Sequence, residues 1–415
     1  MKKNITEEIT CPFCPLLCDD VSITHDNKKF KVNNLKNKEC IKKFESFNIN
    51  SKSVLVPKIK NKISSFNDAI LNSKLLIKQA NEIGILNRGA DVASIRSAIN
   101  LCSQINANFD HVNSKYFFDN MNIVQRSGFI ATTLMEVKNR ADTILVFGNN
   151  VFNKAPRLIE KILSSKSSLY TRRKARKIFL IGEFSQKNIN DLKKHLQVTY
   201  IKIKLNKIPQ FLESINLNKN NYKMNVSKKI LTALKLSLRK SKYITAIYSS
   251  SDFYTTGISG SIVNSITQFI CDLNTTIRAA CLPIAGNLGD ASNNQVATWL
   301  TGFPVRFKGV NGIFKHDREA YDVTKLIENN EIDLAIHFNS LSLDKIKLNK
   351  KIKNIVIGHP QTSCTSPPDV FIPIGIPGID SSGIMFRTDN VVSMPLKSFR
   401  NLKIPLLNQV IDKMV

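Results

Sequence analysis

Short apolar runs alternate with amphipathic stretches along the chain after about residue 55. Most of the apolar runs are rich in β-branched or aromatic residues and precede Gly, Asn or Ser, which is typical of strands: 143–147, 178–181, 200–203, 244–248, 334–338 and 355–357. Helical patterns lie between them; in residues 226–240 the apolar positions form one stripe. Because these strands are continuously apolar, we predict parallel sheets covered by helices on both faces, and therefore an α/β fold.

The first 55 residues differ from the remainder. They hold four of the eight cysteines and show no long helical period. We therefore predict a small cysteine-rich module over residues 1–55, followed by two Rossmann-like parallel-sheet domains over 56–225 and 226–415. The Lys-rich residues 217–229 are the predicted link between these domains, and the Pro- and Gly-rich residues 362–396 are expected to form ordered loops with short strands.

The composition is that of a globular chain. Of 415 residues, 42% are hydrophobic and 22% charged, which excludes a wholly disordered protein. No uncharged apolar stretch of about 18 residues is present, so we expect no membrane-spanning helix. The first residues lack the apolar run of a secretory signal, and the expected location is the cytoplasm.

The chain carries a formal net charge of +28. Its basic residues are spread along a sequence dominated by Lys, Asn and Ile, as A/T-rich codons would produce. The densest basic cluster, residues 172–177, has no interleaved aromatic side chains for base stacking. We therefore expect no nucleic-acid partner, and interpret this cluster as a solvated loop or as an interface to an acidic sister chain.

Four cysteines have the spacing of an iron–sulfur site. Cys11, Cys14 and Cys18 lie in one short segment, and Cys40 follows 21 residues after Cys18. A [4Fe-4S] cluster takes four thiolates, three of which can come from one tight loop. Zinc also accepts four thiolates, but structural zinc sites usually use two paired knuckles. Spacing establishes capacity and not occupancy, so a cluster is favoured while a metal-free site stays open.

Residues 10–20 (TCPFCPLLCDD) resemble the start of the B subunit of formylmethanofuran dehydrogenase, of the molybdopterin oxidoreductase superfamily. They look closest to the version found in the formyltransferase/hydrolase complex of methylotrophic bacteria. Three further segments match this family in order: 136–150, 282–304 and 374–396. The similarity covers residues 9 to 397. Trp299, within the second of these segments, is expected to pack in the core.

The resemblance implies α/β domains that cradle a tungsten or molybdenum pyranopterin dinucleotide behind the iron–sulfur module. Phosphates of a dinucleotide bind where strands end in small residues and helix N-termini offer free N–H groups. The residues at such strand ends are Gly148, Asn149, Gly182, Gly358 and His359. Ordinary strand-to-loop turns would use the same residues.

One departure from the family bears on activity. Redox-active members ligate the metal through a Cys or selenocysteine, followed by a His, shortly before the segment that matches residues 136–142. Residues 112–118 contain neither, and Lys115 or a neighbour stands at the ligand position. An ammonium group is a poor ligand for a high-valent metal. Ser114 and His111 lie nearby, but neither is favoured as a ligand. We therefore expect the pterin metal to be absent.

The resulting hypothesis is a cytoplasmic scaffold chain, without oxidoreductase activity of its own. Its complex would convert formyl-tetrahydromethanopterin to formate through a furan-linked carrier. The expected partners are the other subunits of the complex and that carrier, and the basic surface is a candidate contact for either. The alternative is an active tungsten- or molybdenum-dependent enzyme that interconverts the formyl group and CO2.

Overall fold

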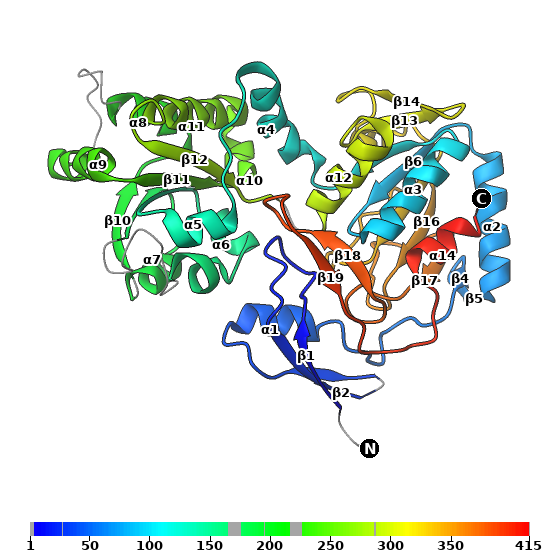
Figure 1. Ribbon diagram of the computed structural model, residues 1–415. Coiled ribbons are helices and arrows are strands. Elements are labelled where there is room, and N and C mark those ends of the chain that lie inside the picture. The colour runs from blue at the N-terminus through cyan, green and yellow to red at the C-terminus, as the bar shows by residue number, and fades with distance from the viewer. Residues whose placement is uncertain are drawn as a thin grey trace. The chain divides into compact units, whose positions relative to one another are not determined.

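A computed structural model describes residues 4–26, 28–164, 176–194, 196–215, 226–285 and 288–414. The chain forms two compact units, and the colours of Figure 1 follow the residue numbers that define them. Unit 1 combines Met1–Ser114 with Asn287–Val415, and unit 2 is Lys115–Gly286. The mixed α/β class predicted from the apolar pattern is confirmed. In sequence, unit 2 is an insertion within unit 1.

Unit 2 is built on a parallel sheet of five strands in the order β10-β9-β8-β11-β12. The strands are β8 (Thr143–Phe147), β9 (Lys177–Gly182), β10 (Gln197–Lys202), β11 (Tyr243–Tyr248) and β12 (Arg278–Pro283). In chain order this is 3-2-1-4-5, so the direction of winding reverses between β8 and β11. The predicted boundary between residues 225 and 226 falls inside this sheet, between β10 and β11. Residues 217–225 of the predicted link lie outside the described residues.

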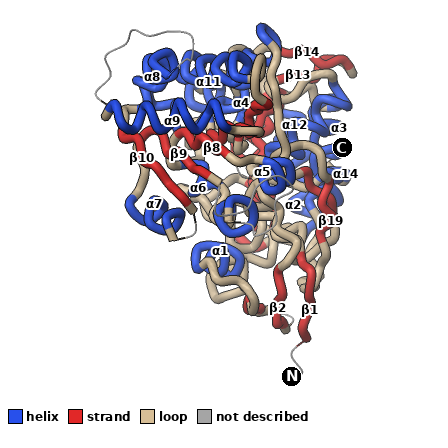
Figure 2. Tube along the Cα trace, turned by 60° about the vertical axis from the view of Figure 1, so that its left-hand side comes forward, coloured by secondary structure: helices blue, strands red, loops and turns tan. Residues whose placement is uncertain are grey.

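Helices cover both faces of this sheet (Figures 1 and 2). The apolar faces of α8, α9 and α11 pack on the side of Leu145 and Phe147, whereas α6 and α7 lie on the other side. The helices of unit 2 are α4 (Ser114–Ser127), α5 (Leu134–Arg140), α6 (Asn150–Lys154), the π-helix η1 (Ile159–Leu163), α7 (Gln186–Lys193), α8 (Ile208–Ile215), α9 (Lys228–Lys240), α10 (Ser250–Phe253) and α11 (Ser259–Leu273). The described residues of the unit also form two 3-10 turns, η3 (Leu205–Lys207) and η4 (Tyr254–Thr256).

The large sheet of unit 1 has nine strands in the order β14-β13-β7-β6-β15-β16-β17-β4-β5. Its centre is parallel: β7 (Asn108–His111), β6 (Ile83–Asn87), β15 (Leu334–Asn339), β16 (Lys353–Gly358) and β17 (Val370–Pro373). The edges are antiparallel: β13 (Phe307–Val310), β14 (Ile313–His316), β4 (Lys58–Ile59) and β5 (Lys62–Ile63). The central order is 2-1-3-4-5 along the chain, with the reversal between β6 and β15.

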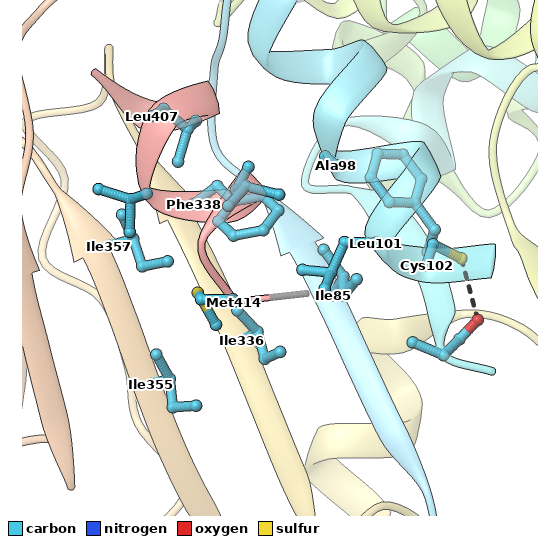
Figure 3. Close-up of a cluster of buried hydrophobic side chains, with 14 of the residues drawn as sticks. Ile85, Ala98, Leu101, Cys102, Ile336, Phe338, Ile355, Ile357, Leu407 and Met414 are labelled. Carbon is cyan, nitrogen blue, oxygen red and sulfur yellow. Dashed lines mark hydrogen bonds between the residues drawn. The ribbon is translucent and has the colours of Figure 1, made fainter. Parts of the chain in front are cut away.

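The main core of unit 1 lies on one face of this sheet, where Ile85, Ile336 and Ile355 meet the helices (Figure 3). The covering helices are α2 (Phe66–Gln79), α3 (Val92–Gln104), α12 (Asp290–Thr301) and α14 (Leu407–Asp412). On the opposite face α13 (Val323–Asn329) covers β6, and the connection from β15 to β16 is an irregular loop rather than a helix. This substitution of a loop for a helix leaves part of that face open.

The N-terminal residues form an antiparallel sheet of β1 (Asn4–Ile9), β2 (Val21–His25) and β3 (Phe30–Val32), followed by α1 (Lys38–Glu45). Phe13 stacks on Phe47 with ring centroids 4.3 Å apart. The same apolar cluster includes residues from the C-terminal hairpin β18 (Gly383–Phe386) and β19 (Ser393–Leu396), so both ends of the chain share one core.

The expectation that Trp299 packs in the core is wrong. Its side chain is 50% exposed near the end of α12, and its ring makes an edge-to-face contact with Phe386 at a centroid distance of 5.8 Å. An isolated Trp in a helix carries no sequence signal for which face it occupies. Among the described residues, no helix combines the length and apolar character needed to cross a membrane.

Candidate functional site

The loop between β1 and β2 carries Cys11, Cys14 and Cys18 and closes on itself. The N–H of Cys11 donates to the carbonyl of Cys18 at 2.8 Å, and Leu17, with φ of 44°, turns the chain between them. Cys40 comes from the first turn of α1, where the side chain of Asn37 accepts the N–H groups of residues 39 and 40. A helix N-terminus stabilises a thiolate at this position.

The thiols of this segment act on the pKa values of Cys11 and Cys14. Burial raises the pKa of Cys11 well above its usual value, and the other three thiols raise it further. Burial also raises the pKa of Cys14, while the N–H groups of Leu16 and Leu17 and the ammonium of Lys43 act in the opposite direction. Four thiolates in this apolar cluster therefore require a cationic centre to offset their charge.

The donor set, four thiols, is of the kind that both zinc and a four-iron cluster take. Within the described residues, no three His, Cys, Asp or Glu side chains are grouped closely enough to hold one metal ion. A tetrahedral zinc site with bonds of ~2.3 Å would hold its sulfurs about 3.7 Å apart. A four-iron cluster is larger and takes one thiolate per iron. Backbone N–H groups directed at the sulfurs of Cys11 and Cys14 are the hydrogen bonds that tune such clusters.

The structure brings Gly148, Asn149 and Gly182 together at the carboxyl ends of β8 and β9. A Cβ on Gly182 would lie 3.5 Å from the backbone nitrogen of Gly148. The side chain of Asn149 is already engaged, since its Oδ1 accepts from the Ser185 N–H at 3.1 Å. These residues therefore stand at the expected strand ends, beside the point where the order of this sheet reverses.

A carboxylate of the chain itself occupies this strand end. The N–H of Asn150 donates to Asp252 at 3.0 Å, and a Cβ on Gly148 would lie 2.6 Å from the Asp252 carboxyl carbon. Burial raises the pKa of Asp252 to about 7, opposed by hydrogen bonds from the backbone of Asn150 and by the charge of Lys154. A bound phosphate would have to share these N–H groups with this carboxyl group.

Lys115, the residue predicted at the family's metal-ligand position, lies against aromatic rings. Its Nζ is 5.0 Å from the centroid of Tyr116 and 4.7 Å from that of Tyr254. Lys154 also approaches Tyr116, at 5.1 Å. Cation–π contacts of this kind stabilise the charged ammonium form and do not offer a lone pair to a metal.

The two neighbouring candidates for a metal ligand have structural partners. Ser114 Oγ accepts from Arg306 Nε at 3.2 Å, in a buried cluster with Asp110. His111 accepts the N–H of Asn113 at its Nδ1 and pairs through Nε2 with a backbone carbonyl. Burial lowers the pKa of His111 to about 4, so it is neutral at pH 7.

Gly358 and His359 belong to unit 1, whereas Gly148, Asn149 and Gly182 belong to unit 2. A Cβ on Gly358 would meet Thr362 at 2.5 Å, as expected of a tight turn. His359 is fully buried, donates from Nε2 to the carbonyl of Ser342 at 2.6 Å and accepts the N–H of Gln361 at Nδ1. Its ring lies 5.0 Å from that of Phe47, so it helps hold the N-terminal residues.

The predicted basic cluster has one residue with a clear structural role. Residues 172–175 lie outside the described part of the chain, but Arg176 is 1% exposed and donates to backbone carbonyls of α5 and η1. Lys177 begins β9 and reaches Ser237 Oγ at 3.1 Å. Arg176 is therefore an internal cap rather than part of a solvated face.

Sequence reasoning missed Asp252, Tyr254, Arg88 and His337. Asp252 and Tyr254 contact residues more than a hundred positions earlier in the chain, and no local sequence pattern predicts such a contact. Arg88 and His337 follow or belong to apolar strands, and the histidine in an otherwise apolar strand was the one signal that could have identified the cavity described below.

No family model matches the chain. Curated relatives match nearly all of it. The chain is 23% identical over 419 residues to the B subunit of tungsten-containing formylmethanofuran dehydrogenase 2 from Methanocaldococcus jannaschii, covering 94% of this chain and 92% of that protein. It is 21% identical over 433 residues to the protein of the same name from Methanococcus maripaludis, covering 97% and 95%.

A third relative belongs to another complex. The B subunit of the formyltransferase/hydrolase complex Fhc from Methylorubrum extorquens is 21% identical over 324 residues, 77% of this chain and 85% of that protein. The fold also matches a chain in the crystal structure of the formyltransferase/hydrolase complex FhcABCD from that organism in complex with methylofuran. The TM-score is 0.73 at 19% identity, covering 86% of this chain and 97% of that chain. The resemblance inferred from the motifs is thus confirmed: this chain is a homologue of the B subunits of formylmethanofuran dehydrogenase and of the Fhc complex.

Proposed function

We propose that this chain is the B subunit of a formyltransferase/hydrolase-type complex, in which it is a scaffold without redox activity of its own. Sister subunits would move the formyl group from formyl-tetrahydromethanopterin to a furan-linked carrier and release formate. Similarity along more than nine-tenths of two relatives supports the B-subunit assignment. The observation that carries the scaffold role is Lys115, which stands on tyrosine rings where the redox-active relatives are expected to hold a thiolate or selenolate.

The residues at the strand end of unit 2 do not fit a pyranopterin metal centre. Two ammonium groups, Lys115 and Lys154, lie around Tyr116, and a cation is repelled by a high-valent metal. The carboxyl group of Asp252 occupies the N–H groups that a dinucleotide phosphate would use. We therefore assign no step of the reaction to such a cofactor in this chain.

The four thiols are proposed as a separate iron–sulfur site. Cys11, Cys14, Cys18 and Cys40 would each hold one iron, with Lys43 compensating the negative charge of the cluster. When bound, such a cluster supplies one-electron transfer. In a scaffold chain its contribution would be structural, since it ties the loop between β1 and β2 to α1. The finer fold assignment, a cysteine-rich module with two Rossmann-like domains, is part of the same proposal.

The proposed partners are the sister subunits and the furan-linked carrier, in the cytoplasm. A net charge of +28 gives the surface a field that would attract acidic partners. Such contacts are screened by salt within about 10 Å at 0.1 M ionic strength. We expect assembly to weaken as ionic strength rises. Assembly that ignores salt would exclude the charge as its basis.

The decisive experiment is to purify the full chain with its neighbouring subunits and to measure formate release, tungsten and molybdenum. The scaffold proposal predicts formate release without stoichiometric tungsten or molybdenum. Lys115→Met should leave that activity unchanged, with Lys325→Met, an exposed lysine elsewhere, as the control. Iron and acid-labile sulfide should each approach about four per chain, as a four-iron cluster requires. Cys14→Ser should lower both, whereas Cys102→Ser, a buried thiol outside the site, should not.

The second candidate is an active tungsten- or molybdenum-dependent formyl oxidoreductase. It is favoured by the names of the two relatives that match the larger share of this chain. Stoichiometric tungsten or molybdenum in the purified complex, with formyl oxidation that is lost when the metal is removed, would support it and refute the scaffold role.

A further inference from the structure

A cavity of about 580 Å³ opens on the face of the unit 1 sheet that has a loop in place of a crossover helix. Its floor is formed by Leu86 of β6 and His337 of β15, the two strands between which the strand order reverses. Arg88 follows β6 directly, and its N–H donates to the carbonyl of Phe338 at 2.7 Å. In open parallel sheets, ligands bind where the strand order reverses.

Two side chains that line this cavity carry buried polar atoms that lack a hydrogen bond of full geometry among the described residues. These atoms are both ring nitrogens of His337 and the Nε of Arg88. His337 is 1% exposed. Asn354 lies on the same face of the neighbouring strand β16, opposite Ala335. Burial lowers the pKa of His337 to about 3, and a hydrogen bond with the side chain of Asn354 opposes this shift. Buried polar groups are normally fully paired, so the incompletely paired Arg88 and His337 in one cavity indicate a missing partner.

The other buried histidines provide an internal comparison. His111 and His359 are equally buried, and each ring has partners at both nitrogens. Those two rings are ordinary structural histidines. His337 is equally buried, but among the described residues only the side chain of Asn354 interacts with its ring as a hydrogen-bond partner, which leaves one ring nitrogen for a further group.

The charge around the cavity favours an anion. Arg88 makes no hydrogen bond or ion pair through its guanidinium among the described residues, and three lysines of the β15–β16 loop add further positive charge: Lys345, Lys347 and Lys351. The opposing acids are Glu328 in the wall and Asp344, whose charge reaches Arg88. Cations therefore outnumber acids. Leu86, Ile327 and Leu348 provide an apolar wall beside them.

We propose that this cavity binds a small organic oxyanion, whose phosphate or carboxylate group pairs with Arg88 and His337 and whose apolar part lies against Leu86, Ile327 and Leu348. A guanidinium presents parallel N–H donors that match either group. Neutral His337 can donate from one nitrogen and accept at the other. This site is independent of the role proposed for the complex, because it shares no residue with the cysteine loop or with the strand end at Gly148.

Calorimetric titration of the full chain with inorganic phosphate, and separately with malonate, tests the proposal. Ionic strength is held constant with potassium chloride, so that general screening does not change. We expect saturable binding of at least one of the two anions to the wild-type chain. Phosphate binding alone would identify a phosphoryl ligand, and malonate binding alone a carboxylate ligand; either supports the site.

Matched variants separate this site from the general positive charge. Arg88→Met should weaken binding about tenfold or more, which corresponds to the loss of one charge-assisted pair. Arg96→Met, an exposed arginine of α3 outside the cavity lining, should leave binding unchanged. His337→Phe is the second variant, and circular dichroism checks that each variant is folded. The proposal is overturned if neither anion binds, or if Arg88→Met and Arg96→Met weaken binding equally.

Discussion

Replacing Arg176 should destabilise unit 2 more than any charge reversal on its surface would. The guanidinium is buried and donates to five backbone carbonyls. Two of these carbonyls, of Val137 and Lys138, belong to the last turn of α5, and a third, of Ala141, is at its C-cap. The other two, of Ile162 and Leu163, lie at the end of η1. The final carbonyls of a helix have no partner within the helix, so Arg176 serves two helix ends at once.

The expected loss in the free energy of unfolding can be worked out from the three shortest of these hydrogen bonds. The distances to Lys138, Ala141 and Leu163 are 2.7, 2.9 and 2.9 Å. A hydrogen bond from a charged donor contributes about 1.5–3 kcal/mol, and three of them give about 4.5–9 kcal/mol. Burying the cation costs several kcal/mol, which also lowers the pKa of Arg176. For Arg176→Met we expect a net loss of about 3–5 kcal/mol in the free energy of unfolding.

Urea unfolding followed by circular dichroism would measure this loss, and scanning calorimetry should show the transition of unit 2 at a temperature lower by about 10 °C. Lys177→Met is the matched control, because its side chain makes one hydrogen bond, to Ser237, and should cost less than about 1 kcal/mol. The loss should persist at high salt, since a buried group is poorly screened. A loss below about 1 kcal/mol for Arg176→Met would refute the capping role.

Three further substitutions test other parts of the structure. Gly148→Ala should lower the free energy of unfolding by more than about 2 kcal/mol, because the added Cβ would meet Asp252 at 2.6 Å. Gly257→Ala, also at positive φ but in open space, should lower it by about 1 kcal/mol. Equal shifts in melting temperature for the two variants would rule out the clash. The pKa of Asp252 is raised to about 7, so the folded state holds its proton from about pH 4 to 7 and stability declines as pH rises through that window. Asp252→Asn should make this decline shallower by at most about 1.4 kcal/mol per pH unit, and an unchanged pH profile of urea midpoints would contradict the assignment. Burial lowers the pKa of His359 to about 4, so the stability that its neutral ring provides is lost as pH falls below about 6.5. His359→Gln should therefore lower the free energy of unfolding by about 1–3 kcal/mol at pH 8 and by less at pH 5. A loss that grows on acidification would show that the ring is charged in the folded protein.

The strands were predictable because burial on both faces leaves a local signature. All six predicted apolar runs are strands of the two sheets, and the predicted helix 226–240 is α9. Helices on both sides of a parallel sheet force its strands to be apolar without alternation, as in Ile144, Leu145 and Val146. The α/β class followed directly from this pattern.

The division of the chain was not predictable in the same way. The chain leaves unit 1 after Ser114, within the run that opens α4, and no Pro- or Gly-rich linker marks the point. The pairing of β8 with β11 places both strands in one sheet and so excludes a domain boundary between them; it joins residues about a hundred positions apart. Such pairings depend on tertiary contacts, and hydrophobic periodicity carries no information about them.

The candidate sites also differ in how far local sequence predicts them. The approach of Cys11, Cys14 and Cys18 is encoded locally by their spacing, which places all three in one loop. Gly148 and Asn149 do follow the end of a strand, as the pattern predicted, but their partner Asp252 was missed because it arrives from a distant turn. Local sequence therefore identified the backbone at that strand end and not the group that fills it.

The shared core at the two ends of the chain sets an order of events during synthesis. The cysteine loop leaves the ribosome well before its packing partners, because Gly378 packs against Pro12 and the N–H of Thr388 donates to the carbonyl of Pro15. Until residues 378–388 emerge, the four sulfurs lack part of their apolar surroundings and remain open to oxidants and to stray metals. Any metal that this loop carries is consequently best delivered after those residues have been translated, and a nascent chain stalled before residue 376 would expose reactive thiols to the cell.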